Sequence, residues 1–317
     1  MNASVNMLRK LPIGIQSFEK LRSEGFLYVD KTAFVFRLAQ AGAPCFLSRP
    51  RRFGKSLLLS TFEAYFKGKK ELFKGLAIEQ LEQNWFEYPV LHLDLNAEKY
   101  DSKERLEKML EFQLAKWETQ YGVDKGTMTF SGRFATIIQQ AYEQNGRRVV
   151  VLVDEYDKPM LQAIGNEKLQ KQFRDTLKPF YGALKTMDGY IKFAFLTGVT
   201  KFGKVSVFSD LNNLDDISMR KDYVEICGVS DQELHENLDI ELHEFAETQG
   251  LSYDKLCTKL KEYYDGYHFT HNSIGIYNPF SLLNAFKYKE FGSYWFETGT
   301  PTYLVKLLKK HHYDLER

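Results

Sequence analysis

The sequence is poor in cysteine, in unbalanced charge and in long hydrophobic runs. Its 3 cysteines, Cys45, Cys227 and Cys257, lie far apart and never in Cys-x-x-Cys spacing, which argues against a disulfide framework and a thiolate zinc site. Lysine and arginine (43) balance aspartate and glutamate (42), so no overall field attracts nucleic acid or anionic membrane. We recognise no export signal or membrane span, because the apolar stretches are short or broken by polar side chains. We therefore expect a cytoplasmic protein without membrane contact.

What the chain does contain is an alternation of short apolar runs and longer charged segments. The predicted strands are rich in β-branched and aromatic residues and span residues 44–48, 89–95, 148–153 and 190–196. The predicted helices have helical spacing of apolar residues and span residues 55–66, 103–121, 132–144 and 170–187. Such an alternation requires crossovers between strands. It predicts an α/β fold with a mainly parallel sheet covered on both faces.

The pattern changes near Val229. Two helices are predicted there, followed by turn-rich sequence and a last helix, over residues 231–249, 253–264 and 301–311. We therefore divide the chain into a core over residues 1–228 and a smaller, mainly helical part over residues 229–317.

The most informative segment, residues 44–60, reads as strand, basic loop, Gly-Lys-Ser and amphipathic helix, which is the layout of a phosphate-binding loop. Gly54 lets backbone amides approach the ligand, Lys55 can reach the β- and γ-phosphates, and Ser56 can hold Mg²⁺. The candidate nucleotide-binding residues of this loop are Arg49, Pro50, Arg51, Arg52, Phe53, Gly54, Lys55, Ser56 and Leu57.

The start of the loop departs from the pattern Gly-x-x-x-x-Gly-Lys-Ser/Thr, because Arg49 and Pro50 stand where the first glycine and its neighbour are expected. The loop is therefore expected to be shaped differently there. Three alternatives are open for Arg49, Arg51 and Arg52: they add positive charge beside the phosphates, they lie in solvent, or they bind a nucleic-acid backbone. A basic turn before an ordinary helix is the alternative for the whole segment.

Two carboxylates follow the strand at 148–153. ATP hydrolysis needs a carboxylate that orients the metal and a base for water. Asp154 could order Mg²⁺ through water, and Glu155 could activate the attacking water. Ser56 and Asp154 are thus the candidate metal residues, and Glu155 and Lys55 the candidate catalytic residues. The alternative is a pair of solvated loop acids.

Three further side chains are weaker candidates. Thr197 and Lys201 follow the strand at 190–196, where a γ-phosphate sensor would sit, although Thr197 could equally cap a turn and Lys201 could be a surface charge. Arg174 could reach the nucleotide or face water, and we favour water.

These motifs resemble the bacterial AAA-ATPase-like family, whose members often carry a C-terminal restriction-endonuclease-like nuclease domain. The two most specific are Arg-Pro-Arg-Arg-Phe-Gly-Lys-Ser at 49–56 and Val-Asp-Glu-Tyr-Asp-Lys-Pro at 153–159. The other segments that carry the resemblance are residues 11–14, 28–32, 196–202, 209–214, 264–267, 277–281 and 295–301. Arginine in place of the first loop glycine is a habit of this family, and the resemblance covers nearly all of residues 8–312.

The resemblance implies a phosphate-loop ATPase core of the additional-strand, catalytic-glutamate kind, followed by a helical or winged-helix-like part. It implies the ATPase roles given above for Lys55, Ser56, Asp154 and Glu155. Because the chain ends at Arg317, shortly after the last predicted helix, we expect no nuclease domain in it.

Two other groupings could have carried function. His268 and His271, and the adjacent His311 and His312, have no further ligand at a recognisable metal spacing. The aromatic residues around 263–269 could stack on bases or plug a core, and we favour the core.

The sequence thus predicts Mg²⁺-dependent ATP binding and hydrolysis, coupled to movement between the core and the C-terminal part. One alternative is a non-hydrolysing nucleotide switch in which Arg49 and Pro50 distort the loop. Another is a DNA-binding module that uses Arg49, Arg51 and Arg52 with the C-terminal part. ATP is the expected partner, while DNA contact and oligomer formation stay open.

Overall fold

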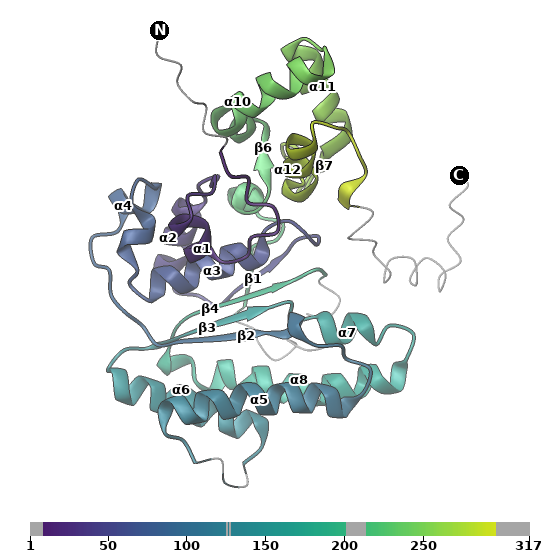
Figure 1. Ribbon diagram of the computed structural model, residues 1–317. Helices are drawn as coiled ribbons and strands as arrows, with labels where there is room; N and C mark the ends of the chain where they lie inside the picture. The colour runs from purple at the N-terminus through teal and green to yellow at the C-terminus, as the bar shows by residue number, and fades with distance from the viewer. Residues whose placement is uncertain (1–8, 125, 127, 201–213, 296–317) are drawn as a thin grey trace.

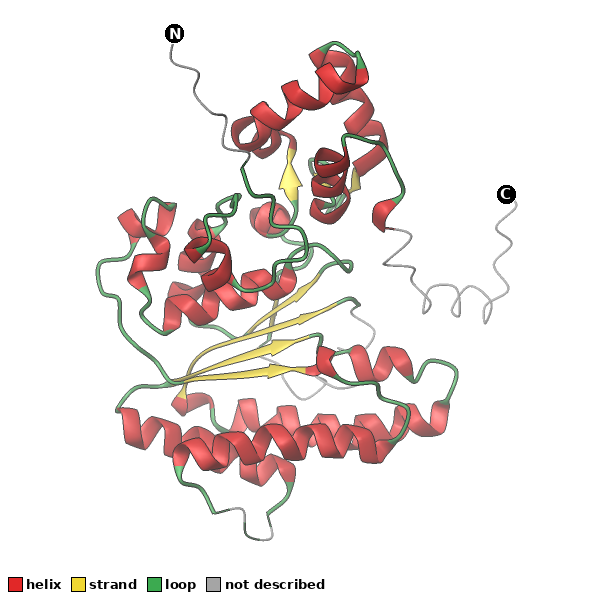
Figure 2. Ribbon diagram, in the orientation of Figure 1, coloured by secondary structure: helices red, strands yellow, loops and turns green. Residues whose placement is uncertain are grey.

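The computed structural model describes residues 9–124, 126, 128–200 and 214–295. Its centre is a five-stranded sheet with strand order β2-β3-β4-β1-β5, in which all neighbouring strands are parallel (Figures 1 and 2). The strands are β1 (Cys45–Ser48), β2 (Val90–Asp94), β3 (Val149–Asp154), β4 (Ile191–Gly198) and β5 (Asp215–Asp216). The predicted α/β class and the four predicted strands are confirmed, and β5 is an addition.

One face of the sheet is covered by three long helices. They are α5 (Lys103–Tyr121), α6 (Phe130–Asn145) and α8 (Glu167–Thr186). Each begins at a side-chain cap, in which Ser102, Thr129 and Asn166 accept a hydrogen bond from a backbone amide three residues later. Their apolar sides pack together on the sheet, and the rings of Phe134 and Phe180 stack with centroids 4.7 Å apart.

The opposite face is covered by shorter helices from the N-terminal part of the chain. They are α1 (Phe18–Ser23), α2 (Thr32–Ala41), α3 (Lys55–Phe66), the 3₁₀ turn η1 (Lys70–Phe73) and α4 (Ala77–Leu81). Phe62 of α3 packs on Phe193 and Phe195 of β4, at centroid distances of 5.1 Å and 4.8 Å. This packing fixes α3, and with it the loop that enters α3, against the middle of the sheet.

The carboxyl ends of β1, β3 and β4 meet at one edge, because parallel strands point the same way. The segments that leave the strands near this edge include the loop from β1 into α3, the 3₁₀ turn η2 (Leu95–Ala97) after β2, and the turn from β3 into α7 (Lys158–Gln162). A further 3₁₀ turn, η3 (Asp188–Tyr190), leads into β4 at the opposite end. Loops at the carboxyl edge of such sheets are where ligands bind.

The elements over residues 229–295, named here the C-terminal unit, form a smaller body beside this edge (Figure 1). They are helices α10 (Asp231–Gln249), α11 (Tyr253–Tyr264) and α12 (Pro279–Tyr288), and strands β6 (Val229–Ser230), β7 (Asp265–Tyr267) and β8 (Ile276–Tyr277). The 3₁₀ segment η4 (Lys221–Ile226) connects the five-stranded sheet to the unit. The strands form an antiparallel sheet in the order β6-β8-β7, and the helices share an apolar cluster of their own.

Helix α12 corrects the prediction of turn-rich sequence after residue 264. Asn278 is its N-cap and accepts a hydrogen bond from the amide of Ser281, while Pro279 occupies the first helical position, where its missing N–H costs nothing. The helix predicted at 301–311 lies outside the described residues. Among the residues that are described, no helix combines the length and the apolar character that crossing a membrane requires.

Candidate functional site

The basic loop runs from the end of β1 to the start of α3 at the carboxyl edge of the sheet. Gly54 precedes α3 with a left-handed φ of 89°, a conformation that costs glycine little. Helix α3 starts at Lys55, so the free amides of its first turn face the same edge. A strand that ends in a loop and a helix N-terminus offers backbone donors to an anion.

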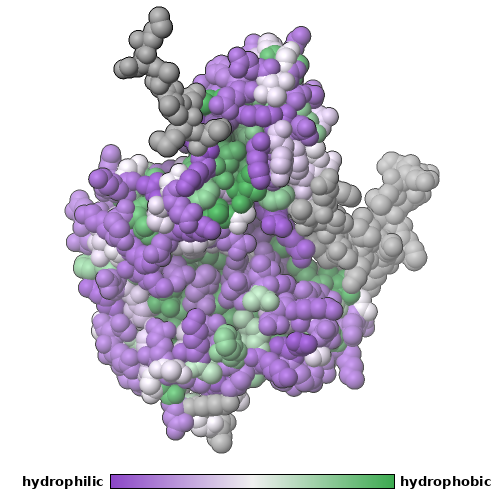
Figure 3. All heavy atoms as spheres, viewed as in Figure 1, coloured by the Kyte–Doolittle hydropathy of each residue, from purple (hydrophilic) through white to green (hydrophobic). Residues whose placement is uncertain are grey.

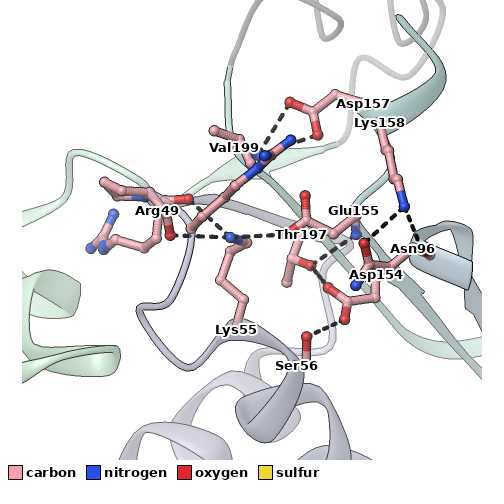
Figure 4. A network of polar contacts seen from close by, with 12 residues as sticks. Arg49, Lys55, Ser56, Asn96, Asp154, Glu155, Asp157, Lys158, Thr197 and Val199 are labelled. Carbon is pink, nitrogen blue, oxygen red and sulfur yellow. Dashed lines mark hydrogen bonds and ion pairs between the residues drawn. The ribbon is translucent and has the colours of Figure 1, made fainter. Parts of the chain in front are cut away.

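Lys55 is almost completely buried beneath this loop, with 4% of its surface exposed. Its Nζ atom lies 3.1 Å from Glu155 Oε1 and donates to the carbonyl oxygens of Arg49 (3.1 Å) and Pro50 (3.2 Å) (Figure 4). The ammonium group therefore joins the loop to the acid that follows β3. The structure thus brings together Lys55 and Glu155, the two candidate catalytic residues.

Asp154 at the end of β3 gathers two hydroxyl groups. Ser56 Oγ donates to Asp154 Oδ2 and Thr197 Oγ1 donates to Asp154 Oδ1, each at 2.5 Å (Figure 4). Strand β4 lies between β1 and β3, which places Thr197 beside Asp154. The three side chains form an oxygen-rich group next to Lys55. Thr197 thus contacts the acid pair instead of capping a turn.

Glu155 adopts a left-handed backbone conformation, with φ 52°. Such a conformation is uncommon for a residue with a Cβ atom and is found most often at functional sites. The amide of Tyr156 donates to the carbonyl of Thr197 at 2.9 Å, which fixes the turn against β4. Glu155 lines a cavity, so it adjoins the space that a ligand would enter.

Arg49 lies elsewhere than expected. The residue is 1% exposed, and its guanidinium group points away from Lys55 and Asp154 (Figure 4). It donates to the carbonyl oxygens of Ser48 (2.9 Å), Ser218 (2.8 Å) and Tyr223 (2.9 Å). Burial lowers the pKa of Arg49 to about 10, which is still high enough for the group to be charged at neutral pH. Neither charge beside the phosphates nor contact with a nucleic-acid backbone fits this position.

The neighbouring loop residues divide between the cavity and the C-terminal unit. Arg51 and Arg52 are exposed and line the cavity, as does the half-buried Leu57. The Arg52 guanidinium also lies 4.9 Å from the centroid of the Phe280 ring. Pro50 contributes the carbonyl that accepts from Lys55, and Phe53 is buried with its ring against the C-terminal unit.

A buried carboxylate that the sequence analysis did not single out supports the acid pair. Asp157 is fully buried and accepts hydrogen bonds from the amides of Val199 and Thr200 and from the Thr200 hydroxyl. Burial, followed by the nearby charge of Glu155, raises the pKa of Asp157 to about 6. Gly198 passes so close that an added Cβ atom would lie 2.4 Å from the Tyr156 ring. The turn after β3 is thereby fastened to the end of β4.

The cavity beside these residues has a volume of about 380 Å³. Its polar end contains Lys55, Ser56, Glu155, Asn96 and Lys158. Its apolar end is formed by residues 12–15 and 27–29 on one side and by Val229, Leu238, Pro279, Phe280 and Leu283 of the C-terminal unit on the other. Figure 3 shows hydrophobic residues gathered at the junction of the core and the C-terminal unit. The buried Lys31 lines the cavity and pairs with Glu233 of α10 across this junction.

Asn96 and Lys158 are cavity residues that sequence reasoning missed. Lys158 Nζ donates to the carbonyl and to the side-chain oxygen (3.0 Å) of Asn96. Desolvation lowers the pKa of Lys158, and the charges of Glu155 and Asp94 oppose that shift. The signal for Lys158 was its place in Val-Asp-Glu-Tyr-Asp-Lys-Pro, where only the first two acids were given a role. For Asn96 the sequence carried no such signal.

The remaining predicted residues do not line the cavity or lie outside the described part. Arg174 of α8 is half-buried and is not among the cavity residues. His268 Nδ1 contacts the carbonyl of Ser273 at 3.0 Å. Lys201, His311 and His312 lie outside the described residues.

Two comparisons with known proteins bear on this site. A family described as "Predicted AAA-ATPase" matches residues 12–208, which include the loop, the acid pair and Thr197. The chain is also 42% identical over 301 residues to a protein from Azotobacter chroococcum mcd 1 described as "Uncharacterized protein in vnfD 5'region". That match covers 95% of this chain and 56% of the relative, so the chain spans little more than half of the relative's length. With most of its core matched, the chain belongs to the AAA-ATPase-like family of predicted ATPases.

Proposed function

We propose that the chain is a Mg²⁺-dependent ATPase of the additional-strand, catalytic-glutamate kind. The observation that carries the proposal is the meeting of Lys55, Ser56, Asp154, Glu155 and Thr197 at the carboxyl edge of the sheet, where Lys55, Ser56 and Glu155 line one cavity. The strand order supports the subtype, because β4 is inserted between the strand that enters the phosphate loop and the strand that ends in the acids. Family membership supports the ATPase class.

The donor set fits a magnesium ion. Ser56 Oγ and the carboxylate of Asp154 are the oxygen ligands that Mg²⁺ prefers, and they already lie in contact. When bound, the ion would neutralise part of the charge on the phosphates. Thr197 holds the other oxygen of Asp154 and so keeps the carboxylate turned toward Ser56. We therefore assign Ser56 and Asp154 as the residues that would hold Mg²⁺.

Lys55 and Glu155 take the catalytic roles. The free amides at the start of α3 and the ammonium group of Lys55 bind the β- and γ-phosphates. A phosphate oxygen competes with Glu155 for the Lys55 ammonium, which frees the carboxylate to accept a proton from the attacking water. The left-handed backbone of Glu155 aims this carboxylate into the cavity. The nucleoside would occupy the apolar end, between residues 12–15 and α12.

The C-terminal unit forms one wall of that cavity, so we propose that nucleotide occupancy moves it relative to the core. Its three helices and small antiparallel sheet agree with a winged-helix-like architecture. The separate apolar cluster of this unit supports the proposed division of the chain near Val229.

A non-hydrolysing switch is the second candidate. It is favoured by the ion pair between Lys55 and Glu155, because a Glu155 that stays paired cannot act as a base. Tight Mg-ATP binding with single-turnover hydrolysis no faster than in Glu155→Gln would support the switch over the ATPase.

Calorimetric titration of Mg-ATP tests the proposal. Wild type is compared with Lys55→Ala and with Lys116→Ala. Lys116 is an exposed lysine of α5, which covers the face of the sheet opposite α3 and is remote from the cavity. We expect binding to wild type and to Lys116→Ala, and none to Lys55→Ala. A folded wild type that binds no Mg-ATP, or a Lys55→Ala variant that binds as well as wild type, would refute the assignment.

A further inference from the structure

The phosphate loop is held by aromatic rings of the C-terminal unit. The guanidinium carbon of Arg49 lies 3.9 Å from the centroid of the Phe269 ring, which follows β7. Phe53 meets Tyr267 and Phe269 edge to face, with centroids 4.7 Å and 5.5 Å away. Trp295 Nε1 donates to the carbonyl of Arg51 at 3.0 Å. Loop residues on both sides of Pro50 thus contact one small region of the unit.

These contacts leave little freedom to the first half of the loop. Phe53 is 1% exposed, and a Cβ atom added at Gly228 would lie 3.2 Å from its ring. The Arg49 guanidinium has three carbonyl acceptors on one side and the Phe269 ring on the other. Cations over aromatic faces are attracted most strongly when both are shielded from water, as Arg49 is.

The same backbone segment also carries acceptors of the phosphate-binding lysine. Lys55 Nζ donates to the carbonyl oxygens of Arg49 and Pro50. The C-terminal unit contacts the Arg49 side chain through Phe269 and the Arg51 carbonyl through Trp295. The orientation of these carbonyls, and hence of Lys55, therefore depends on where Phe269 holds Arg49. Each step is a direct contact: the Phe269 ring lies on the Arg49 guanidinium group, and the main-chain carbonyl of Arg49 accepts from the Lys55 ammonium group.

We propose that Phe269 is a positioning residue for the phosphate loop, and that it couples nucleotide binding at Lys55 to the conformation of the C-terminal unit. The coupling to nucleotide rests on the proposed function, whereas the positioning of the loop does not. Because coupling between two sites is reciprocal, bound Mg-ATP should also slow amide exchange in residues 265–277.

The test uses three variants of the full chain. Phe269→Leu keeps apolar volume but removes the aromatic face, and Phe269→Tyr keeps the face. The matched control is Phe245→Leu, which removes a fully buried ring of the same unit that packs on Phe286 and Phe291, outside the contacts with the loop. The readouts are the Kd for Mg-ATP and, without nucleotide, amide exchange of the peptide over residues 49–58.

We expect the Kd of Phe269→Leu to rise about fivefold and its loop amides to exchange faster. Phe269→Tyr and Phe245→Leu should stay within about twofold of wild type in both readouts. The inference is overturned if Phe269→Leu behaves as wild type, or if Phe245→Leu changes the loop as much. If wild type binds no Mg-ATP, the proposed function fails, and loop exchange alone then decides whether Phe269 positions the loop.

Discussion

The basic loop between β1 and α3 has two sides that differ in chemistry. Toward the C-terminal unit, Arg49 and Phe53 are buried among rings and carbonyl oxygens. Toward the sheet edge, Lys55 and Ser56 contact the carboxylates of Glu155 and Asp154 beside an open cavity. The first side is built like a protein core and the second like a ligand site.

The two sides suggest two roles for a basic residue. Arg49 stabilises the conformation of the loop, whereas Lys55 is placed to bind a ligand. Arg49 and Lys55 lie six positions apart and look equivalent as basic residues. Three main-chain carbonyls surround one, whereas a carboxylate and the cavity adjoin the other. We therefore expect substitutions on the sheet side to change ligand chemistry, and substitutions on the other side to change stability first.

The largest effect is expected on the sheet side, at Glu155. Glu155→Gln removes the base while keeping the shape of the side chain, so ATP turnover should fall at least about a hundredfold while Mg-ATP affinity persists. Steady-state phosphate release and calorimetry measure the two quantities. Glu98→Gln, an exposed acid after η2, is the matched control and should retain turnover. Equal turnover in Glu155→Gln and wild type would sink the role of Glu155.

On the other side, Arg49→Met should lower the free energy of unfolding by about 3 kcal/mol, because three buried carbonyl oxygens lose a charged donor. Urea denaturation followed by circular dichroism measures it. The control is Arg147→Met, whose guanidinium lies 4.2 Å from the centroid of the Phe86 ring and should cost less than about 1 kcal/mol. If Arg49→Met is as stable as wild type but no longer binds ATP, Arg49 acts in ligand binding and the proposed difference between the two sides is wrong.

Gly198→Ala tests how firmly the turn after β3 is fastened to β4. The new Cβ atom would lie 2.4 Å from the Tyr156 ring and 2.8 Å from Asp157 Oδ1, so the turn must shift. We expect a loss of about 2 kcal/mol in unfolding free energy and a lower kcat. Gly182→Ala in α8, where nothing lies within 4 Å of the new atom, should instead be neutral or stabilising. Full activity in Gly198→Ala would show that the turn tolerates displacement.

The buried Asp157 predicts a pH dependence of stability on the sheet side. Its pKa is about 6 in the folded protein against 3.8 for the free side chain, so the folded state binds more protons between these values. Stability from this group therefore falls as pH rises from about 4 to 6, by at most about 1.4 kcal/mol per pH unit. Among the described residues, the ionisable groups that interact with it include Glu155 and Tyr181.

Urea denaturation of wild type and Asp157→Asn across this range isolates the effect, because contributions from groups that do not interact with Asp157 cancel in the difference. The unfolding free energy of Asp157→Asn should increase relative to that of wild type as pH rises. Parallel pH profiles for the two proteins would mean that Asp157 titrates normally.

The two sides also differ in how far sequence could predict them. Strand β3 was predicted because valines fill it; Asp154 is its last residue and Glu155 follows directly. The spacing within Gly-Lys-Ser predicts a phosphate-binding role for the second half of the loop from local sequence alone. Membership of the AAA-ATPase-like family was predicted from the same motifs and is confirmed. These features depend on neighbours in the chain, which a sequence displays.

The direction of Arg49 could not be predicted, because its acceptors at Ser218 and Tyr223 lie about 170 residues away in the chain. The apolar wall of the cavity joins residues 12–15 to α12 and likewise depends on tertiary folding. Helix α12 is a different case. Its Asn-Pro start is a local signal, and the weight given to the turn residues before it caused the wrong prediction.

The smallest expected effect, at Arg52, gives the sharpest test of the boundary between the two sides. Arg52 has a left-handed φ of 67°, and its guanidinium lies 4.9 Å from the centroid of the Phe280 ring. Arg52→Ala loses the ring contact and keeps the backbone strain, so it should lose up to about 1 kcal/mol of unfolding free energy. Arg52→Gly relieves the strain and should be the more stable of the two variants. Because Arg52 also lines the cavity, Mg-ATP titration of both variants decides where it belongs. An affinity loss below about fivefold, the size of a lost cation–π contact, would group Arg52 with Arg49 and Phe53 on the side of the C-terminal unit. Loss of binding as complete as in Lys55→Ala would instead group Arg52 with Lys55, among the residues that bind phosphate.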